Sequence, residues 1–143
     1  MTRSRFLIAL PVTVTIVGVW FPSAFAVGPD ADALKASRTR GVNFLRTTQA
    51  DDGSWTQPDA VGITALAATS LIRSGLAVDD PTVAKALANL QTFIREDGGI
   101  SAEASKHRNY ETSIALLTFQ AANRDGRYDT VIGKAVAFLK GLQ

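Results

Sequence analysis

The chain contains an internal repeat whose copies lie 45 to 49 residues apart. Residues 85–90 follow residues 40–45 at a spacing of 45, and residues 97–100 follow residues 52–55 at the same spacing. A third copy begins at Lys134, 49 residues after the second. Such a period is typical of proteins in which each structural unit buries its apolar face against its neighbours. We therefore expect an array of similar units.

Helices are expected throughout this array, because apolar residues recur three or four positions apart and no segment alternates with a period of two. The helix over 61–74 is apolar nearly all round, which predicts that it is buried. In the helix over about 110–122, the predicted buried stripe is Ile114, Leu117 and Ala121. In full, the pattern predicts one helix capped by Asp30 or Asp32 and ending near Thr48, one over 61–74, one from Pro81 through Ile94, one over 110–122, and one capped by Asp129.

The first copy carries a recognisable motif, made of Arg40, Gly41, Phe44, Leu45, Gln49, Gly53 and Trp55, and the second copy retains Asp97 and Gly98. In order and spacing, these residues resemble the QW repeat motif of the squalene-hopene and oxidosqualene cyclases, whose wider family includes the β-subunits of protein prenyltransferases. The resemblance implies that the motif is structural. The Trp55 indole would lie against the Gln49 amide, and the amide would bond backbone groups at a neighbouring helix end.

The fold implied by this resemblance is an all-α, partial (α/α) toroid, with an inner and an outer layer of helices. Residues 27–143 would supply two helical pairs and one further helix. A complete toroid of the family contains more pairs than these. The resemblance therefore implies an N-terminal fragment, or a naturally short chain that self-associates through its uncovered last helix.

The first 26 residues are expected to be a secretory signal peptide. Two arginines precede an almost wholly apolar run over 6–21, and Ala-Phe-Ala at 24–26 supplies small residues before a cleavage point. The alternative is a retained membrane anchor. Pro11 and the shortness of the run disfavour it, because a membrane span needs about 20 residues. We predict cleavage near Ala26 and export to the periplasm or the exterior.

Charge and cysteine content exclude several functions. The chain has 15 Lys and Arg against 13 Asp and Glu, and Arg3 and Arg5 account for the excess. The remainder is formally neutral, which argues against nucleic acid as a partner. Cysteine is absent, so a disulfide, a cysteine nucleophile and a cysteine-based zinc site are all excluded. We expect no cofactor.

The clusters that do the chemistry in enzymes of this family have no counterpart in the sequence. The cyclases protonate their substrate with an Asp-x-Asp-Asp cluster, and the prenyltransferases hold zinc with Asp, Cys and His. Asp51-Asp52 lacks this spacing and lies in a turn, while Asp79-Asp80 is explained by helix capping. A lone His107 cannot form a zinc site. We therefore assign no catalytic or metal-binding residue.

The candidate ligand-binding residues are His107, Arg108, Asn109, Tyr110 and Glu111. They end a connection that is longer than its counterpart in the first repeat and lead into a buried helix, and ligands often bind at such places. The alternative is structural. In that interpretation Asn109 caps the helix, Glu111 complements its dipole, and His107 and Arg108 lie in solvent.

Three functions follow from these observations. The favoured one is an exported scaffold or binding module without catalysis, whose partner is an apolar isoprenoid-like ligand or a protein. The second is the N-terminal part of a terpenoid cyclase-like enzyme whose catalytic acid lies beyond residue 143. The third is a polysaccharide-active enzyme, which would need a pair of carboxylates that this sequence does not offer.

Overall fold

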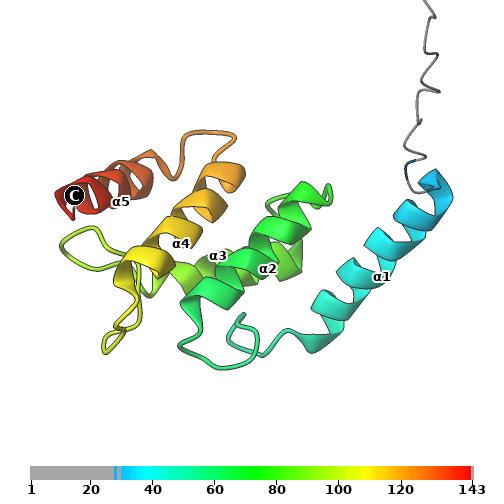
Figure 1. Cartoon of the computed structure of the whole chain (residues 1–143), viewed down its shortest axis with the longest axis horizontal. Coiled ribbons are helices and arrows are strands. Elements are labelled where there is room, and N and C mark those ends of the chain that lie inside the picture. Colours follow the sequence, from blue (N-terminus) through cyan, green and yellow to red (C-terminus); the bar gives the residue numbers. More distant parts are fainter. Residues whose placement is uncertain (1–27, 29, 143) are drawn as a thin grey trace, which may run out of the picture.

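A computed structural model describes residue 28 and residues 30–142. The predicted signal peptide lies outside the described residues. The described chain is all-α, which confirms the predicted class, and its one β-type contact there is a bridge between Ile94 and Ile100 across a turn. Figure 1 shows the helices in chain order: α1 (Ala31–Thr48), α2 (Val61–Arg73), α3 (Pro81–Gln91), α4 (Arg108–Ala122) and α5 (Asp129–Gly141).

Aspartate caps begin α1 and α3. The Asp30 carboxylate accepts a hydrogen bond from Ala33 N–H at 3.1 Å, and the Asp80 carboxylate accepts one from Thr82 N–H at 3.0 Å. Pro81 is the first residue of α3. These bonds satisfy backbone donors that have no partner within the helix, and proline is suited to the first helical position because it lacks that donor.

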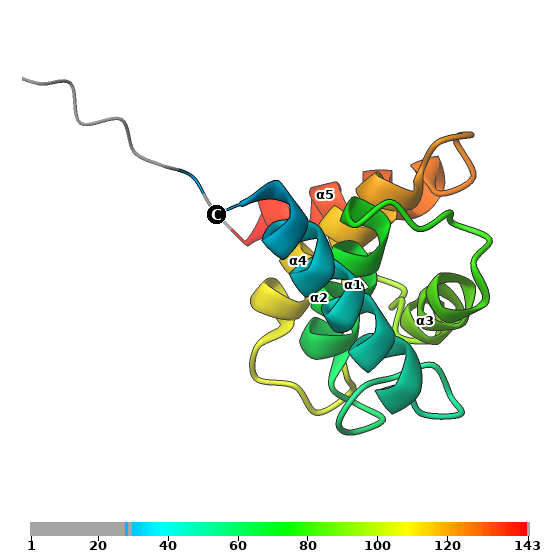
Figure 2. The same cartoon turned by 90° about the vertical axis from the view of Figure 1, so that its right-hand side faces the viewer.

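The core lies along α2 and α4, which pack side by side (Figure 1 and Figure 2). α3 packs against α2, and α5 packs against α4. Nine of the 13 residues of α2 are buried, as expected for a helix that is apolar nearly all round. Full burial of one large apolar side chain contributes about 1.5–3 kcal/mol. The largest of those in this core are Phe119, Leu71, Leu87, Leu90 and Ile100.

Three helix ends differ from the sequence prediction. Asp129 is the first residue of α5 and not its cap, and Tyr128, which holds the cap position, makes no capping side-chain hydrogen bond. α3 ends at Gln91, so Ile94 lies outside the helix and pairs with Ile100 instead. α4 begins at Arg108, which places Asn109 inside the first turn and not at the cap. α3 ends early because Phe93 and Ile94 make turn-type hydrogen bonds to Leu90 O and Gln91 O in place of helical ones. α4 begins early because Glu111 N–H already donates to His107 O at 3.0 Å, in the helical pattern.

The buried face of α4 also differs from the predicted stripe. Leu117, a predicted core residue, is 45% exposed. Thr118 is buried in its place, where its hydroxyl donates to Ala65 O at 2.9 Å and lies 2.9 Å from the Thr69 hydroxyl of α2. A hydrogen-bonded hydroxyl is readily buried, so apolar spacing alone misplaced the face. The residues buried on α4 are Thr112, Ala115, Thr118, Phe119 and Ala122.

The turns after α1 and α3 share one hydrogen-bonding pattern. In the first turn Ala50 N–H donates to Ser54 O at 3.0 Å, and in the second Arg95 N–H donates to Gly99 O at 2.8 Å. The residue that follows each of these carbonyls donates its N–H to a threonine hydroxyl of the next helix. Equivalent residues of the two copies therefore make equivalent contacts.

Through a glycine, each of these turns packs against the second helix after it, α3 for the first turn and α5 for the second. Gly53 has a φ of +89° and Gly98 a φ of +87°, a conformation that favours glycine. A Cβ atom at Gly53 would collide with the Lys85 carbonyl of α3, and one at Gly98 would collide with the Lys134 carbonyl of α5. Both positions thus require glycine for backbone conformation and for space.

Side-chain hydrogen bonds of Gln49 and Trp55 hold the first turn in place. The Gln49 amide donates to Gly53 O at 3.1 Å and to Thr82 O at 2.9 Å, in the first turn of α3. The Trp55 indole N–H donates to Leu45 O at 2.9 Å, and Trp55 is only 4% exposed. These bonds join the end of α1 to the start of α3.

α1 is the least covered helix of the described chain, and none of its residues is buried. Its ties to the rest lie near its C-terminal end, where Arg46 forms an ion pair with Asp80 at 2.5 Å. Phe44 is 64% exposed, and no heavy atom outside the helix backbone lies within 4 Å of a Cβ placed on Gly41. Figure 1 shows α1 at one end of the row of helices.

Candidate functional site

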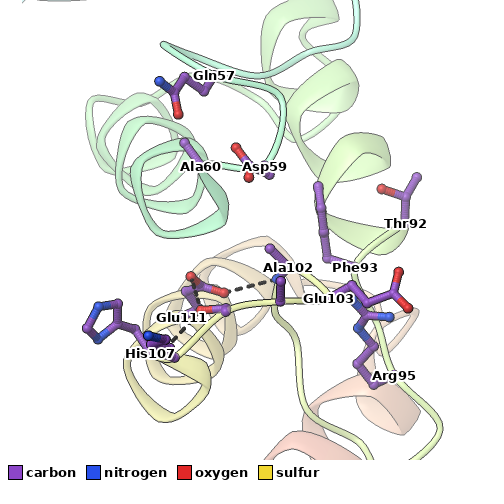
Figure 3. Close-up of a pocket in the computed structure, with 13 residues that line it drawn as sticks. Gln57, Asp59, Ala60, Thr92, Phe93, Arg95, Ala102, Glu103, His107 and Glu111 are labelled. Carbon is purple, nitrogen blue, oxygen red and sulfur yellow. Dashed lines mark hydrogen bonds between the residues drawn. The ribbon is translucent and has the colours of Figure 1, made fainter.

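Two adjoining cavities open at the N-terminal ends of α2 and α4. Their volumes are about 810 Å³ and about 400 Å³. They have wall residues in common, so we treat them as one depression and call it the α2–α4 groove. Figure 3 shows that Asp59 and Ala60, which precede α2, lie across the larger cavity from Glu111 of α4. The principal wall residues are Asp59, Ala60, Ile63, His107, Tyr110 and Glu111.

Three of the five candidate residues from the sequence line this groove: His107, Tyr110 and Glu111. The other two lie elsewhere. Arg108 borders a separate depression of about 410 Å³. Asn109 is exposed, and its backbone carbonyl accepts a hydrogen bond from the Ser113 hydroxyl of the next turn.

Glu111 anchors the loop that forms one wall. Its carboxylate accepts a hydrogen bond from Ala102 N–H at 3.0 Å and another from the Ser105 hydroxyl at 2.7 Å. The Ser105 oxygen in turn accepts His107 N–H at 3.0 Å. The carboxylate therefore holds residues 102–107 against α4. Both of its oxygens already accept a hydrogen bond from this loop.

Arg108 links the second turn to α4 and α5. Its guanidinium donates to the Asp97 carboxylate at 2.6 Å and to the Ser101 hydroxyl at 3.3 Å. The guanidinium carbon lies 4.9 Å from the centre of the Phe138 ring on α5, a cation–π contact. These contacts make Arg108 a structural residue that holds α5 beside the turn.

Asp97 gives this link a pH dependence. The hydrogen bond from Arg108, and then the one from Gly99 N–H, lower the pKa of the Asp97 carboxyl. A lowered folded-state pKa adds stability above the unfolded-state value of about 3.9, and this stability is lost as pH falls through the folded-state pKa. We therefore expect Asp97→Asn to destabilise the protein at neutral pH, and the difference from wild type to shrink in acid.

This expectation is checked by urea unfolding of both chains between neutral pH and strong acid. Glu96→Gln is the control, because Glu96 is the exposed neighbour in the same turn and is expected to leave the profile unchanged. A constant difference between wild type and Asp97→Asn across this pH range would rule out the carboxylate as the source.

Several wall residues of the groove were not among the site residues predicted from the sequence. Gln57 and Asp59 precede α2, while Phe93 follows α3. They meet only because three connections converge at this end of the helices, and such convergence leaves no local pattern. The backbone beside the groove does show one unusual local feature. Thr56 has a φ of +71°, which is rare for a branched side chain and marks a constrained segment next to the groove.

Apolar side chains continue from the groove along both helices. Tyr110 is 55% exposed, and its ring lies against Gly62 of α2, where a Cβ atom would approach it to 2.9 Å. Ile63 and Leu66 of α2 and Leu117 of α4 are also 45–48% exposed. These side chains lie where α2 and α4 are not covered by another described helix.

Across residue 28 and residues 30–142, no group of three His, Asp or Glu side chains is placed to hold a metal ion. Within the same part of the chain, no helix is both long and apolar enough to cross a bilayer.

Comparisons with protein-family models, with curated proteins and with solved structures gave no match for this chain.

Proposed function

We propose that the chain is a partial (α/α) toroid of the squalene cyclase and prenyltransferase type, which acts after removal of its leader as a binding module without catalysis. Its ligand is an apolar, isoprenoid-like molecule. The toroid assignment is supported by the motif residues and by two turns with equivalent hydrogen bonds. It is also supported by the order of the elements, since a well-buried helix is twice followed by a less buried one.

The observation that carries the ligand assignment is the apolar surface beside the α2–α4 groove. Ile63, Leu66, Tyr110 and Leu117 are each about half exposed on the two adjacent helices α2 and α4. Binding sites for small molecules are concave and mostly apolar, with a few polar groups that fix orientation. Covering the exposed half of one such side chain would contribute roughly 1 kcal/mol. Four of them therefore favour an extended apolar ligand over a compact polar one.

Polar groups gather at one end of this surface. Asp59, Glu103 and His107 line the larger cavity, whereas the exposed side chains of Leu66 and Leu117, further along α2 and α4, are apolar. This polarity suits an amphiphilic molecule, whose polar end would lie in the larger cavity and whose chain would follow α2 and α4. The Tyr110 ring lies between these two regions.

The test uses a chain that begins at residue 27, which retains the whole described core between Trp55 and Ala135. Titration with dansyl-farnesol is expected to give a saturable fluorescence change with a dissociation constant on the order of micromolar. Leu66→Asp should weaken binding about tenfold or more, because it places a charge on the apolar surface. Incubation with squalene or farnesyl diphosphate should return the substrate unchanged.

Leu34→Asp is the matched control. Leu34 is 50% exposed and Leu66 is 46% exposed, but Leu34 lies on α1, away from the groove. Circular dichroism should show that both variants keep the wild-type helix content. Equal loss of binding in the two variants, or a titration that does not saturate, would reject the ligand site, and product formation would reject the assignment without catalysis.

A further inference from the structure

Positive charge is concentrated on α1. This helix carries four basic side chains and one acidic one, so the rest of residues 27–143 carries nine basic and twelve acidic side chains. Arg46 forms the ion pair with Asp80, and the other three basic residues are exposed. They are Lys35, Arg38 and Arg40. A segment that is formally neutral as a whole therefore contains one basic helix and an acidic remainder.

One side of this helix is uncharged and partly apolar. Five of its residues follow one another at intervals of three or four, so they lie along the same side. They are Leu34, Ser37, Gly41, Phe44 and Thr48, and we call this side the α1 face. Leu34 is 50% exposed, and Phe44, at 64%, is the most exposed large apolar side chain of the described residues. A Cβ atom added at Gly41 would meet nothing within 4 Å, so the middle of the α1 face has open space around it.

Two of the exposed arginines flank the α1 face. Arg38 follows Leu34 by four residues and Arg40 precedes Phe44 by four, so each arginine lies next to an apolar side chain of the face. The Arg40 guanidinium also donates a hydrogen bond to the Ser37 hydroxyl at 3.0 Å, which holds it beside the face. Apolar side chains bordered by guanidinium groups form an amphipathic surface that combines hydrophobic contact with attraction for anions.

The position of α1 keeps this surface open. The helix stands at one end of the row of helices, and none of its 18 residues is buried (Figure 1 and Figure 2). Its acidic residue Asp32 is two positions before Leu34 and therefore points to another side of the helix. Asp30 caps the helix through Ala33 N–H, at the end away from Phe44. The α1 face can thus meet an anionic surface without an acidic side chain of the same helix between them.

We propose that the α1 face binds the surface of an anionic lipid bilayer. Leu34 and Phe44 enter the boundary between headgroups and acyl chains, and Arg38 and Arg40 bond lipid phosphates beside them. A bilayer fits this face better than an acidic protein, because lipids rearrange around protruding apolar side chains, whereas a folded partner needs a matching pocket. The interaction goes beyond the proposed function and does not depend on the ligand of the α2–α4 groove.

Vesicle sedimentation tests this with the chain from residue 27, which lacks the apolar run over 6–21 and retains the described core. The partition coefficient should be at least about tenfold higher for vesicles of phosphatidylcholine with phosphatidylglycerol than for phosphatidylcholine alone. Added salt should lower it, because salt screens the attraction. Arg38→Gln with Arg40→Gln should weaken binding to the anionic vesicles roughly twentyfold, about fivefold for each charge removed.

Arg124→Gln with Lys140→Gln is the matched control, because it removes the same charge from exposed positions elsewhere. Arg124 follows α4 and Lys140 lies in α5, at the opposite end of the row of helices (Figure 1). This pair should change binding by less than about twofold, since electrostatic attraction falls off within about 10 Å at ordinary salt. An equal loss in the two pairs would show that net charge alone acts, and would overturn the proposal.

The apolar contribution is tested at Phe44. Phe44→Trp should keep the binding, and its fluorescence should shift to shorter wavelength on anionic vesicles because the indole leaves water. Trp55, the other tryptophan of that chain, is buried and gives a constant background. Phe44→Asp should weaken binding about tenfold or more, with helix content unchanged by circular dichroism. Unchanged emission of the Phe44→Trp variant, or unchanged binding of Phe44→Asp, would overturn the proposal. Binding to polyglutamate without binding to vesicles would also overturn it, and would assign the α1 face to an acidic protein.

Discussion

Replacing Gly98 by Ala will destabilise the protein by about 2 kcal/mol or more, and Gly53→Ala will have a similar effect. Both residues have a positive φ, which an alanine adopts only with strain. The added methyl group would also meet the carbonyl of Lys134 or Lys85, and a helix backbone cannot move aside as a flexible side chain can. A small domain is stable by only about 5–15 kcal/mol, so the loss is a large part of the total.

Urea unfolding of the chain from residue 27, followed by circular dichroism, measures this effect. Gly41→Ala is the matched control, because Gly41 lies within α1 and a Cβ atom there would meet nothing within 4 Å. That substitution should stabilise the protein by up to about 1 kcal/mol, through helix propensity. If all three substitutions change stability alike, the two turns do not pack as described.

Trp55→Ala will cost about 3–5 kcal/mol, the range for removing a large buried aromatic side chain. Trp55 is 4% exposed, and its indole N–H donates a hydrogen bond to the α1 backbone at Leu45 O. Its removal leaves a cavity beside α2 and an unpaired carbonyl at the end of α1. We therefore expect α1 to separate from the core before the rest of the protein unfolds.

Phe44→Ala controls for loss of an aromatic residue from the same motif. Phe44 is 64% exposed in the described chain, so its truncation should change stability by no more than about 0.5 kcal/mol in the chain from residue 27. Both variants are compared by thermal unfolding with circular dichroism. A Trp55→Ala variant that melts with the wild-type midpoint would show that the indole is not part of the core.

Helix positions could be predicted from the sequence where capping and turn residues lie at the helix ends. Asp30 and Asp80 cap α1 and α3, and the Asp-Gly pairs at 52–53 and 97–98 mark the turns that follow. The helix over 61–74 was predicted to be buried because it is apolar nearly all round, and nine of the 13 residues of α2 are buried, although Ile63 and Leu66 are about half exposed. These features depend on residues that are close together in the chain.

The errors arose where distant residues decide. Thr118 is buried because its hydroxyl reaches Ala65, which lies 53 residues earlier, and no local period shows this. The candidate site was predicted in part for the same reason. His107, Tyr110 and Glu111 line the groove, but Asp59 and Phe93 reach it from other connections. The hydrogen bonds by which the Glu111 carboxylate holds the loop over 102–107 were also not predicted.

The hydroxyl pair of Thr69 and Thr118 determines how α2 and α4 are aligned along their axes. Small side chains line much of this interface, and surfaces of that kind tolerate a shift of one helix along the other with little change in buried area. A hydrogen bond between two particular hydroxyls is directional and is lost on any such shift. Valine at both positions would keep the volume while removing this preference, so the two helices would then populate several sliding arrangements instead of one.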